Sequence, residues 1–122
     1  MYVHQTAIFV DKTTRWGLER NVKTHLNGLS LVDALPASWR LDHGYVNKRE
    51  AWKYRFIGKL VPVQGETVLV LLDAFLRGDH GYHSYLRDPA RYGGKHLDPL
   101  IDLSQLTTRR RSADLIHSAQ LS

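Results

Sequence analysis

Two consecutive strand patterns in the middle of the chain constrain its fold more than any other feature. From Trp52 to Phe56, aromatic and basic side chains alternate, which is the period of a strand with one packed and one solvated face. The turn residues Val63–Glu66 lead into a second strand over Thr67–Leu76, whose apolar run Val68–Leu72 suits burial on both faces. Arg77–Gly78 ends that strand. The pattern predicts an antiparallel hairpin.

The N-terminal part of the chain favours another strand followed by helices. Val3–Val10 is apolar and β-branched enough for a strand, and Asp11 can cap a helix over Lys12–Asn27. A second, short helix is expected over Ser30–Leu35. The long helix carries one apolar stripe, which consists of Leu18, Val22, Leu26 and Leu29. This order predicts an α+β fold in which an N-terminal strand and helices pack on a mainly antiparallel sheet.

Chain length sets the number of domains. The 122 residues, 43% of them hydrophobic, are enough for one core, so residues 1–122 are expected to form a single domain. Beyond Arg77 the sequence predicts a loop and a short helix up to Gly94. A small apolar patch over residues 100–106 and a last helix capped by Ser112 complete the predicted chain.

Charge and cysteine content limit the class of partner. Lys and Arg number 17 against 12 Asp and Glu, giving a net charge of +5, which favours polyanions such as nucleic acid. The absence of cysteine excludes disulfides and thiolate metal sites and fits a cytoplasmic protein. The longest apolar run, Val68–Leu72, is far shorter than the about 20 residues of a membrane span, and the N-terminus lacks a secretion signal. We therefore expect a soluble cytoplasmic protein without a membrane partner.

The segment Arg77–Tyr85 concentrates groups that can move protons. It holds two histidines and two tyrosines. Histidine as a residue type has a reference pKa near neutrality, so His80 and His83 are the better candidates for acid and base, whereas a tyrosine needs neighbouring cations. The same two histidines, together with His96 and a neighbouring aspartate, could instead ligate a metal ion, although their spacing matches no zinc signature.

Several conspicuous side chains have a structural interpretation. Lys53 and Arg55 are typical of the solvated face of a sheet, and the tyrosines of Arg77–Tyr85 can pack at the edge of the core. The tryptophans Trp16, Trp39 and Trp52 are assigned to the core. Without supporting neighbours in the sequence, four histidines receive no functional role: His4, His25, His43 and His117. Arg20 and His25 have the spacing of a motif from an all-helical ribonuclease family, which we interpret as coincidental in a strand-rich chain.

The hairpin resembles part of a family of bacterial toxins. Trp52–Lys59 and Val68–Arg77 are similar to the two central strands of the RelE/ParE/HigB superfamily, and the similarity covers about residues 48–85. The resemblance implies a RelE/ParE-like fold and a metal-independent endoribonuclease that needs no cofactor. It implies a catalytic site containing Lys53, Arg55, Arg77 and Tyr82 or His83, to which His80 is added as an acid or base. Lys48, Arg49 and Lys59 would hold RNA.

This chemistry requires three kinds of group. Cleavage of RNA by its own 2′-hydroxyl needs a base for that hydroxyl, cations for the charge on the phosphorane and an acid for the departing 5′-oxygen. The lysine and arginines would supply the cations, and histidine or tyrosine the acid and base. The basic run of Arg109, Arg110 and Arg111 is a further candidate for RNA contact.

A rival function comes from another class. A small basic protein that binds nucleic acid or a protein partner without catalysis accounts for the same charge and aromatic residues. A toxin would act on RNA, free or on the ribosome, and would be neutralised by an acidic protein antitoxin. A homodimer, and a metal-dependent nuclease built on the three histidines, are the remaining alternatives.

Overall fold

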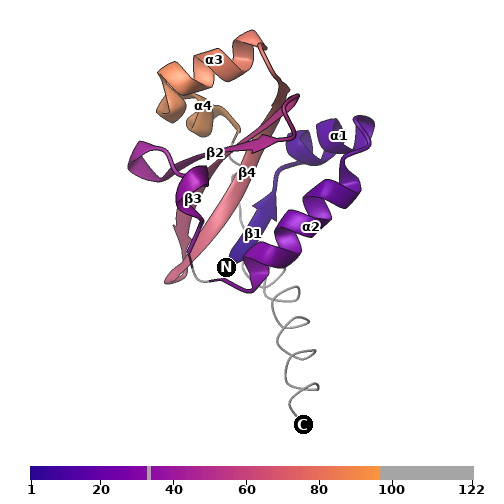
Figure 1. Cartoon of the computed structure of the whole chain (residues 1–122). Coiled ribbons are helices and arrows are strands. Elements are labelled where there is room, and N and C mark those ends of the chain that lie inside the picture. Colours follow the sequence, from indigo (N-terminus) through magenta and orange to yellow (C-terminus); the bar gives the residue numbers. More distant parts are fainter. Residues whose placement is uncertain (33, 97–122) are drawn as a thin grey trace.

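The computed structural model describes residues 1–32 and 34–96 (Figure 1). Three sequence expectations lie outside the described residues: the apolar patch over 100–106, the RNA contacts Arg109–Arg111 and the helix that begins after Ser112. The described elements are, in chain order, β1 (Tyr2–Gln5), α1 (Ala7–Arg15), α2 (Glu19–Ser30), the 3₁₀ turns η1 (Ala37–Trp39) and η2 (Asp42–Gly44), β2 (Tyr45–Glu50), β3 (Tyr54–Val63), β4 (Glu66–Leu76), α3 (His80–Arg87) and α4 (Pro89–His96).

A four-stranded mixed sheet forms the middle layer. Its strand order is β1-β4-β3-β2, with β1 parallel to β4 and the other neighbours antiparallel. Figure 1 shows α1 and α2 on one face of the sheet and α3 and α4 on the other. The predicted α+β class is confirmed, and the sheet is mainly antiparallel. No helix in residues 1–32 and 34–96 is long and apolar enough to cross a membrane.

Each face of the sheet has its own apolar core. The core beneath α1 and α2 includes Phe9, Leu18, Val22, Leu26, Leu29, Trp39, Val46, Phe56, Leu69 and Leu71. The core beneath α3 and α4 includes Tyr45, Ile57, Val68, Val70, Leu72, Phe75, Tyr82 and Tyr85. Successive residues of β4 point to opposite cores because side chains alternate along a strand. The predicted burial of Val68–Leu72 on both faces and of the apolar stripe on α2 is therefore confirmed.

The predicted hairpin between β3 and β4 is also confirmed. The strands meet at Gln64 and Gly65, whose φ angles are 50° and 81°, and a two-residue hairpin loop with two positive φ angles has the handedness that matches twisted strands. β4 ends at Leu76, and Gly78 follows with φ of 84°. The sequence therefore located the C-terminal end of the central strand and placed its start one residue late.

The N-terminal boundaries predicted from sequence were wrong. β1 ends at Gln5, and residues 7–10 are helical rather than extended. Thr6, not Asp11, caps α1, since its hydroxyl accepts a hydrogen bond from the Phe9 N–H. Its hydroxyl also donates to backbone carbonyls of β4, at 3.0 Å from the oxygens of Leu71 and Leu72. A single threonine thus ends the strand and starts the helix.

Two further expectations about helices differ from the structure. The predicted helix over Lys12–Asn27 is divided in two at Gly17, whose φ is 69°. Asp11 lies within α1 and pairs with Arg15 at 2.8 Å, one helical turn away. No separate helix begins in the described part of Ser30–Leu35; instead α2 continues through Gly28 and ends at Ser30.

The face of β3 predicted to be solvated is buried. Arg55 is only 8% exposed, and along β3 it lies on the same face as Ile57, which belongs to the core beneath α3 and α4. A period of two identifies the two faces of a strand, but it cannot show whether a later helix covers the polar one. Trp52, predicted to be core, precedes β3 and is 73% exposed.

Candidate nucleic-acid interface

Aromatic and basic side chains gather where the β2–β3 hairpin meets the end of β4. The loop 51–53 joins the cross-strand partners Glu50 and Tyr54, and the Arg77 guanidinium lies 5.8 Å from the centre of the Trp52 ring. The Lys53 ammonium lies 5.6 Å from the Tyr54 ring, which stacks on Trp16 at 5.5 Å. We call Trp16, Trp52, Lys53, Tyr54 and Arg77 the hairpin-tip surface.

Hydrogen bonds from two arginines to backbone carbonyls hold this loop in place. The Arg55 guanidinium donates to the carbonyls of Trp52 and Tyr54 at 3.2 and 2.8 Å. The Arg77 N–H donates to the Lys53 carbonyl at 2.7 Å, which ties the loop to the end of β4. Ala51 adopts a positive φ of 49°, a strained conformation for a residue with a Cβ. The loop that carries Trp52 is therefore anchored at both sides.

The hairpin-tip surface is electrostatically positive. Within residues 1–32 and 34–96, neither Lys53 nor Arg77 forms an ion pair. Arg55 adds a third charge beneath the loop, since its described partners are uncharged carbonyls. Neighbouring unneutralised cations attract anions, and aromatic faces beside them can accept a stacked base.

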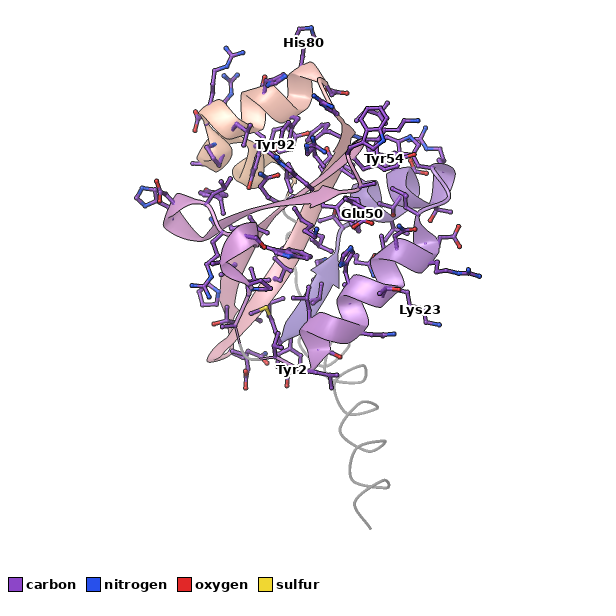
Figure 2. All side chains as sticks on the ribbon, viewed as in Figure 1. Tyr2, Lys23, Glu50, Tyr54, His80 and Tyr92 are labelled. Atoms are coloured by element: carbon purple, nitrogen blue, oxygen red, sulfur yellow. The ribbon has the colours of Figure 1, made fainter. Side chains whose placement is uncertain are left out.

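The predicted catalytic residues do not converge on one point. Lys53 and Arg77 come together at the hairpin tip, but Arg55 is buried beneath it. Tyr82 is also buried, and its hydroxyl donates to the Asn47 amide oxygen at 2.8 Å. His80 and His83 lie exposed on α3, and Figure 2 shows His80 pointing away from the sheet. Of the two histidines, His83 is 6.0 Å from the Tyr82 ring.

The predicted RNA-holding residues fall at two ends of the hairpin. On β2, Lys48 lies 5.7 Å from the Trp39 ring and Arg49 is exposed, so both are close to the tip along the strand. Lys59 pairs with Tyr45 at the other end of the β2–β3 ladder, about 17 Å away at the rise of a strand. Lys48 and Arg49 can therefore extend the hairpin-tip surface, whereas Lys59 cannot contact the same nucleotide.

The metal alternative receives no support from the described side chains. Among them there is no group of three or more histidine or carboxylate residues that could hold an ion. His80 and His83 lie on α3, and His96 is the last residue of α4. A site that requires His96 remains a prediction.

Sequence reasoning missed a histidine–carboxylate pair beside the hairpin. His25 on α2 pairs through Nε2 with Glu50 at the end of β2, and the Asn21 amide donates to the other carboxylate oxygen at 3.0 Å. Burial raises the pKa of Glu50, but the hydrogen bonds from Asn21 and His25 outweigh it and leave that pKa below its ordinary value. The spacing of Asn21 and His25, one helical turn apart, was the available sequence signal; Glu50 could not be assigned to them without the fold.

No family model matches the chain, and searches for similar proteins and similar solved structures also found no match. The resemblance to the RelE/ParE/HigB superfamily therefore remains a prediction.

Proposed function

We propose that this protein binds single-stranded RNA at the hairpin-tip surface. The observation that carries the proposal is Trp52, which is 73% exposed and lies against the Arg77 guanidinium on an anchored loop. An exposed tryptophan contributes little to folding, and one held beside free cations has the properties of a stacking platform for bases. Such platforms are worth about 1–3 kcal/mol per base in single-strand binding.

Binding has more support than cleavage by the residues predicted from sequence. Arg55 and Tyr82 are committed to hydrogen bonds inside the fold. Within the described residues, neither His80 nor His83 has a hydrogen bond or ion pair that would orient it as an acid or base. The toxin activity, the acidic antitoxin and a homodimer stay predictions.

The test is RNA affinity measured by fluorescence anisotropy with single-stranded RNA of about 12 nucleotides, within the usual range of site sizes. Loss of one stacked base in Trp52→Ala should raise Kd by about 5- to 150-fold. Arg77→Gln should lower the slope of log Kd against log salt by about 0.7, the value for one phosphate contact on a single strand.

Two exposed positions away from the tip serve as matched controls. Leu31 is 74% exposed at the C-terminal end of α2, and Leu31→Ala removes an equally accessible apolar side chain. Figure 2 shows Lys23 extending from α2 into solvent, so Lys23→Gln removes one cation elsewhere. Both should bind as the wild type does. Equal losses in Trp52→Ala and Leu31→Ala, or in Arg77→Gln and Lys23→Gln, would refute a localised site. Tighter binding to single-stranded DNA of the same sequence would show that the site prefers DNA to RNA.

A further inference from the structure

A shallow pocket beside the hairpin tip contains the histidine–carboxylate pair. It has a volume of about 280 Å³ and is lined by Arg20, Asn21, Thr24, His25 and Glu50. Four of these residues lie on one side of α2, at positions separated by one turn, and the fifth closes the pocket from the end of β2. We call it the α2 pocket.

The imidazole of His25 is held as a proton-transferring group would be. Its Nε2 faces the Glu50 carboxylate, and the Trp39 ring packs edge-on against it at 5.7 Å between centroids. Within the described residues, Nδ1 has no hydrogen-bond partner. The side chain is 29% exposed, so a substrate can reach it. One ring nitrogen oriented by a carboxylate and the other open to the pocket is the arrangement of a general base.

The charges around His25 suit a phosphodiester. Glu50 is kept ionised by Asn21 and His25, and Lys48 on the same strand adds a favourable charge near it. Arg20 lines the pocket, and its guanidinium forms no ion pair or hydrogen bond within the described residues. A free guanidinium beside a base can bind a phosphate oxygen through two parallel N–H donors.

The α2 pocket and the hairpin-tip surface are neighbours. Glu50 precedes Trp52 by two residues, so their Cα atoms are at most about 7 Å apart. Glu50 and Tyr54 are cross-strand partners, and Figure 2 shows both between the sheet and the helices α1 and α2. An RNA strand with one base stacked on Trp52 can therefore place an adjoining phosphate in the pocket.

We propose that His25, positioned by Glu50, is the general base that cleaves RNA bound at the hairpin-tip surface, a step that rests on the function proposed above. Nδ1 of His25 takes the proton of a ribose 2′-hydroxyl, and the 2′-oxygen forms a bond to the adjacent phosphorus. The bond from phosphorus to the 5′-oxygen breaks, and that oxygen takes a proton from water; the hydroxide that remains takes the proton from the His25 imidazolium, which regenerates the base. Arg20 neutralises charge on the phosphorane. The products are a 2′,3′-cyclic phosphate and a 5′-hydroxyl end.

The test uses the full chain with 5′-labelled single-stranded RNA and the all-2′-deoxy strand of the same sequence. Wild type should cut RNA to fragments with 2′,3′-cyclic phosphate ends and leave the deoxy strand intact. His25→Ala should lower kcat by about 100-fold or more, with Kd for RNA within threefold, roughly the limit for a group acting only in the transition state. Added imidazole should restore part of its rate.

Glu50 is a positioning residue and has a separate readout. Glu50→Gln should lower kcat with little change in KM, and imidazole should not restore its rate, because the tethered base is still present. Lys23→Gln, on the exposed side of the same helix, is the matched control and should cleave as the wild type does. Thermal unfolding of each variant identifies any that is unfolded at the assay temperature.

The outcomes separate this inference from RNA binding itself. Wild type that binds RNA but does not cut it overturns the catalytic role of His25 and leaves the proposed function standing, whether or not any variant folds. If the wild type does not bind RNA, both the proposed function and the catalytic role of His25 are overturned. Cleavage that persists in folded His25→Ala, or folded His25→Ala that loses activity without any rescue by imidazole, also overturns the proposal.

Discussion

Replacing Tyr85 by phenylalanine removes one buried oxygen atom that joins α3 to the sheet. The side chain is fully buried. Its hydroxyl accepts a hydrogen bond from the Val46 N–H at 3.1 Å and lies 2.7 Å from the Val46 carbonyl and 3.0 Å from the Gly58 carbonyl, to which it donates. Val46 of β2 and Gly58 of β3 are cross-strand partners, so this one hydroxyl contacts the backbone of two neighbouring strands.

The free-energy cost of Tyr85→Phe follows from the buried backbone groups that lose the hydroxyl as a hydrogen-bond partner. An unsatisfied buried N–H costs about 1–3 kcal/mol, and loss of the donated hydrogen bond costs about 0.5–1.5 kcal/mol. We therefore expect the free energy of unfolding to fall by about 2–4 kcal/mol. At about 5 °C per kcal/mol for a domain of this size, Tm should drop by about 10–20 °C.

Tyr82 supplies the matched control on the same helix. Its hydroxyl bonds the Asn47 side chain, which is partly exposed, so water can replace the hydroxyl in Tyr82→Phe. That change should cost less than about 1 kcal/mol. The stability of both variants can be measured by urea and thermal unfolding, with circular dichroism as the signal. Equal stabilities of the two variants would refute the role of the Tyr85 hydroxyl in the strand pairing.

Four further substitutions test packing and pH dependence. Gly58→Ala should destabilise the fold because an added Cβ would lie 2.5 Å from the Val70 carbonyl, whereas Gly28→Ala, which meets nothing within 4 Å, should stabilise it by about 0.5–1 kcal/mol; thermal melts compare the two. Because the folded pKa of Glu50 is lowered, its contribution to the free energy of unfolding is present above the unfolded pKa near 4.5 and is lost at lower pH. In Glu50→Gln, the free energy of unfolding measured with urea should therefore fall less steeply as the pH is lowered. The same steepness as in the wild type would contradict this. Burial and the hydrogen bond to Asp73 raise the pKa of Tyr92. The contribution of Tyr92 to the free energy of unfolding is therefore present below about pH 10 and is lost at higher pH. In thermal melts at alkaline pH, Tyr92→Phe should lose stability less steeply with rising pH than the wild type does.

The buried carboxylate of Asp73 on β4 connects the helices that lie on the two faces of the sheet. Asp73 is buried and pairs with Lys12 of α1 at 2.7 Å, while the Tyr92 hydroxyl of α4 donates to its second oxygen at 2.6 Å. The Ala74 N–H donates to the same carboxylate. One carboxylate therefore contacts helices from both sides of the sheet, and nothing in the local sequence around Asp73 indicates it.

Part of the candidate site could be predicted from sequence. The basic and aromatic character of Trp52–Phe56 and the arginine after the central strand follow directly from residue order, and the structure does bring Lys53 and Arg77 together. Trp52 was assigned to the core because aromatic side chains are usually buried. Its position in a three-residue loop, set by where β2 and β3 stop pairing, exposes it instead.

His25 and Glu50 show the limit of such reasoning. They are 25 residues apart, and nothing in either segment indicates that the two side chains pair. Their pairing depends on α2 packing against the end of β2, a contact set by the apolar stripe of the helix and the register of the hairpin together. The same holds for Arg55, which a period-two pattern assigned to solvent and which is buried with its guanidinium bonded to the carbonyls of Trp52 and Tyr54.

The sequence by itself determined the elements whose signals are local. A two-residue turn, a continuous apolar run and an apolar stripe one turn apart act within a few residues, so the hairpin, the buried central strand and the inner face of α2 followed from residue order. Only the tertiary structure decided which polar side chains are covered and which distant ones meet. Burial and pairing depend on what the rest of the chain places against a residue, and that information is shared among segments far apart in sequence.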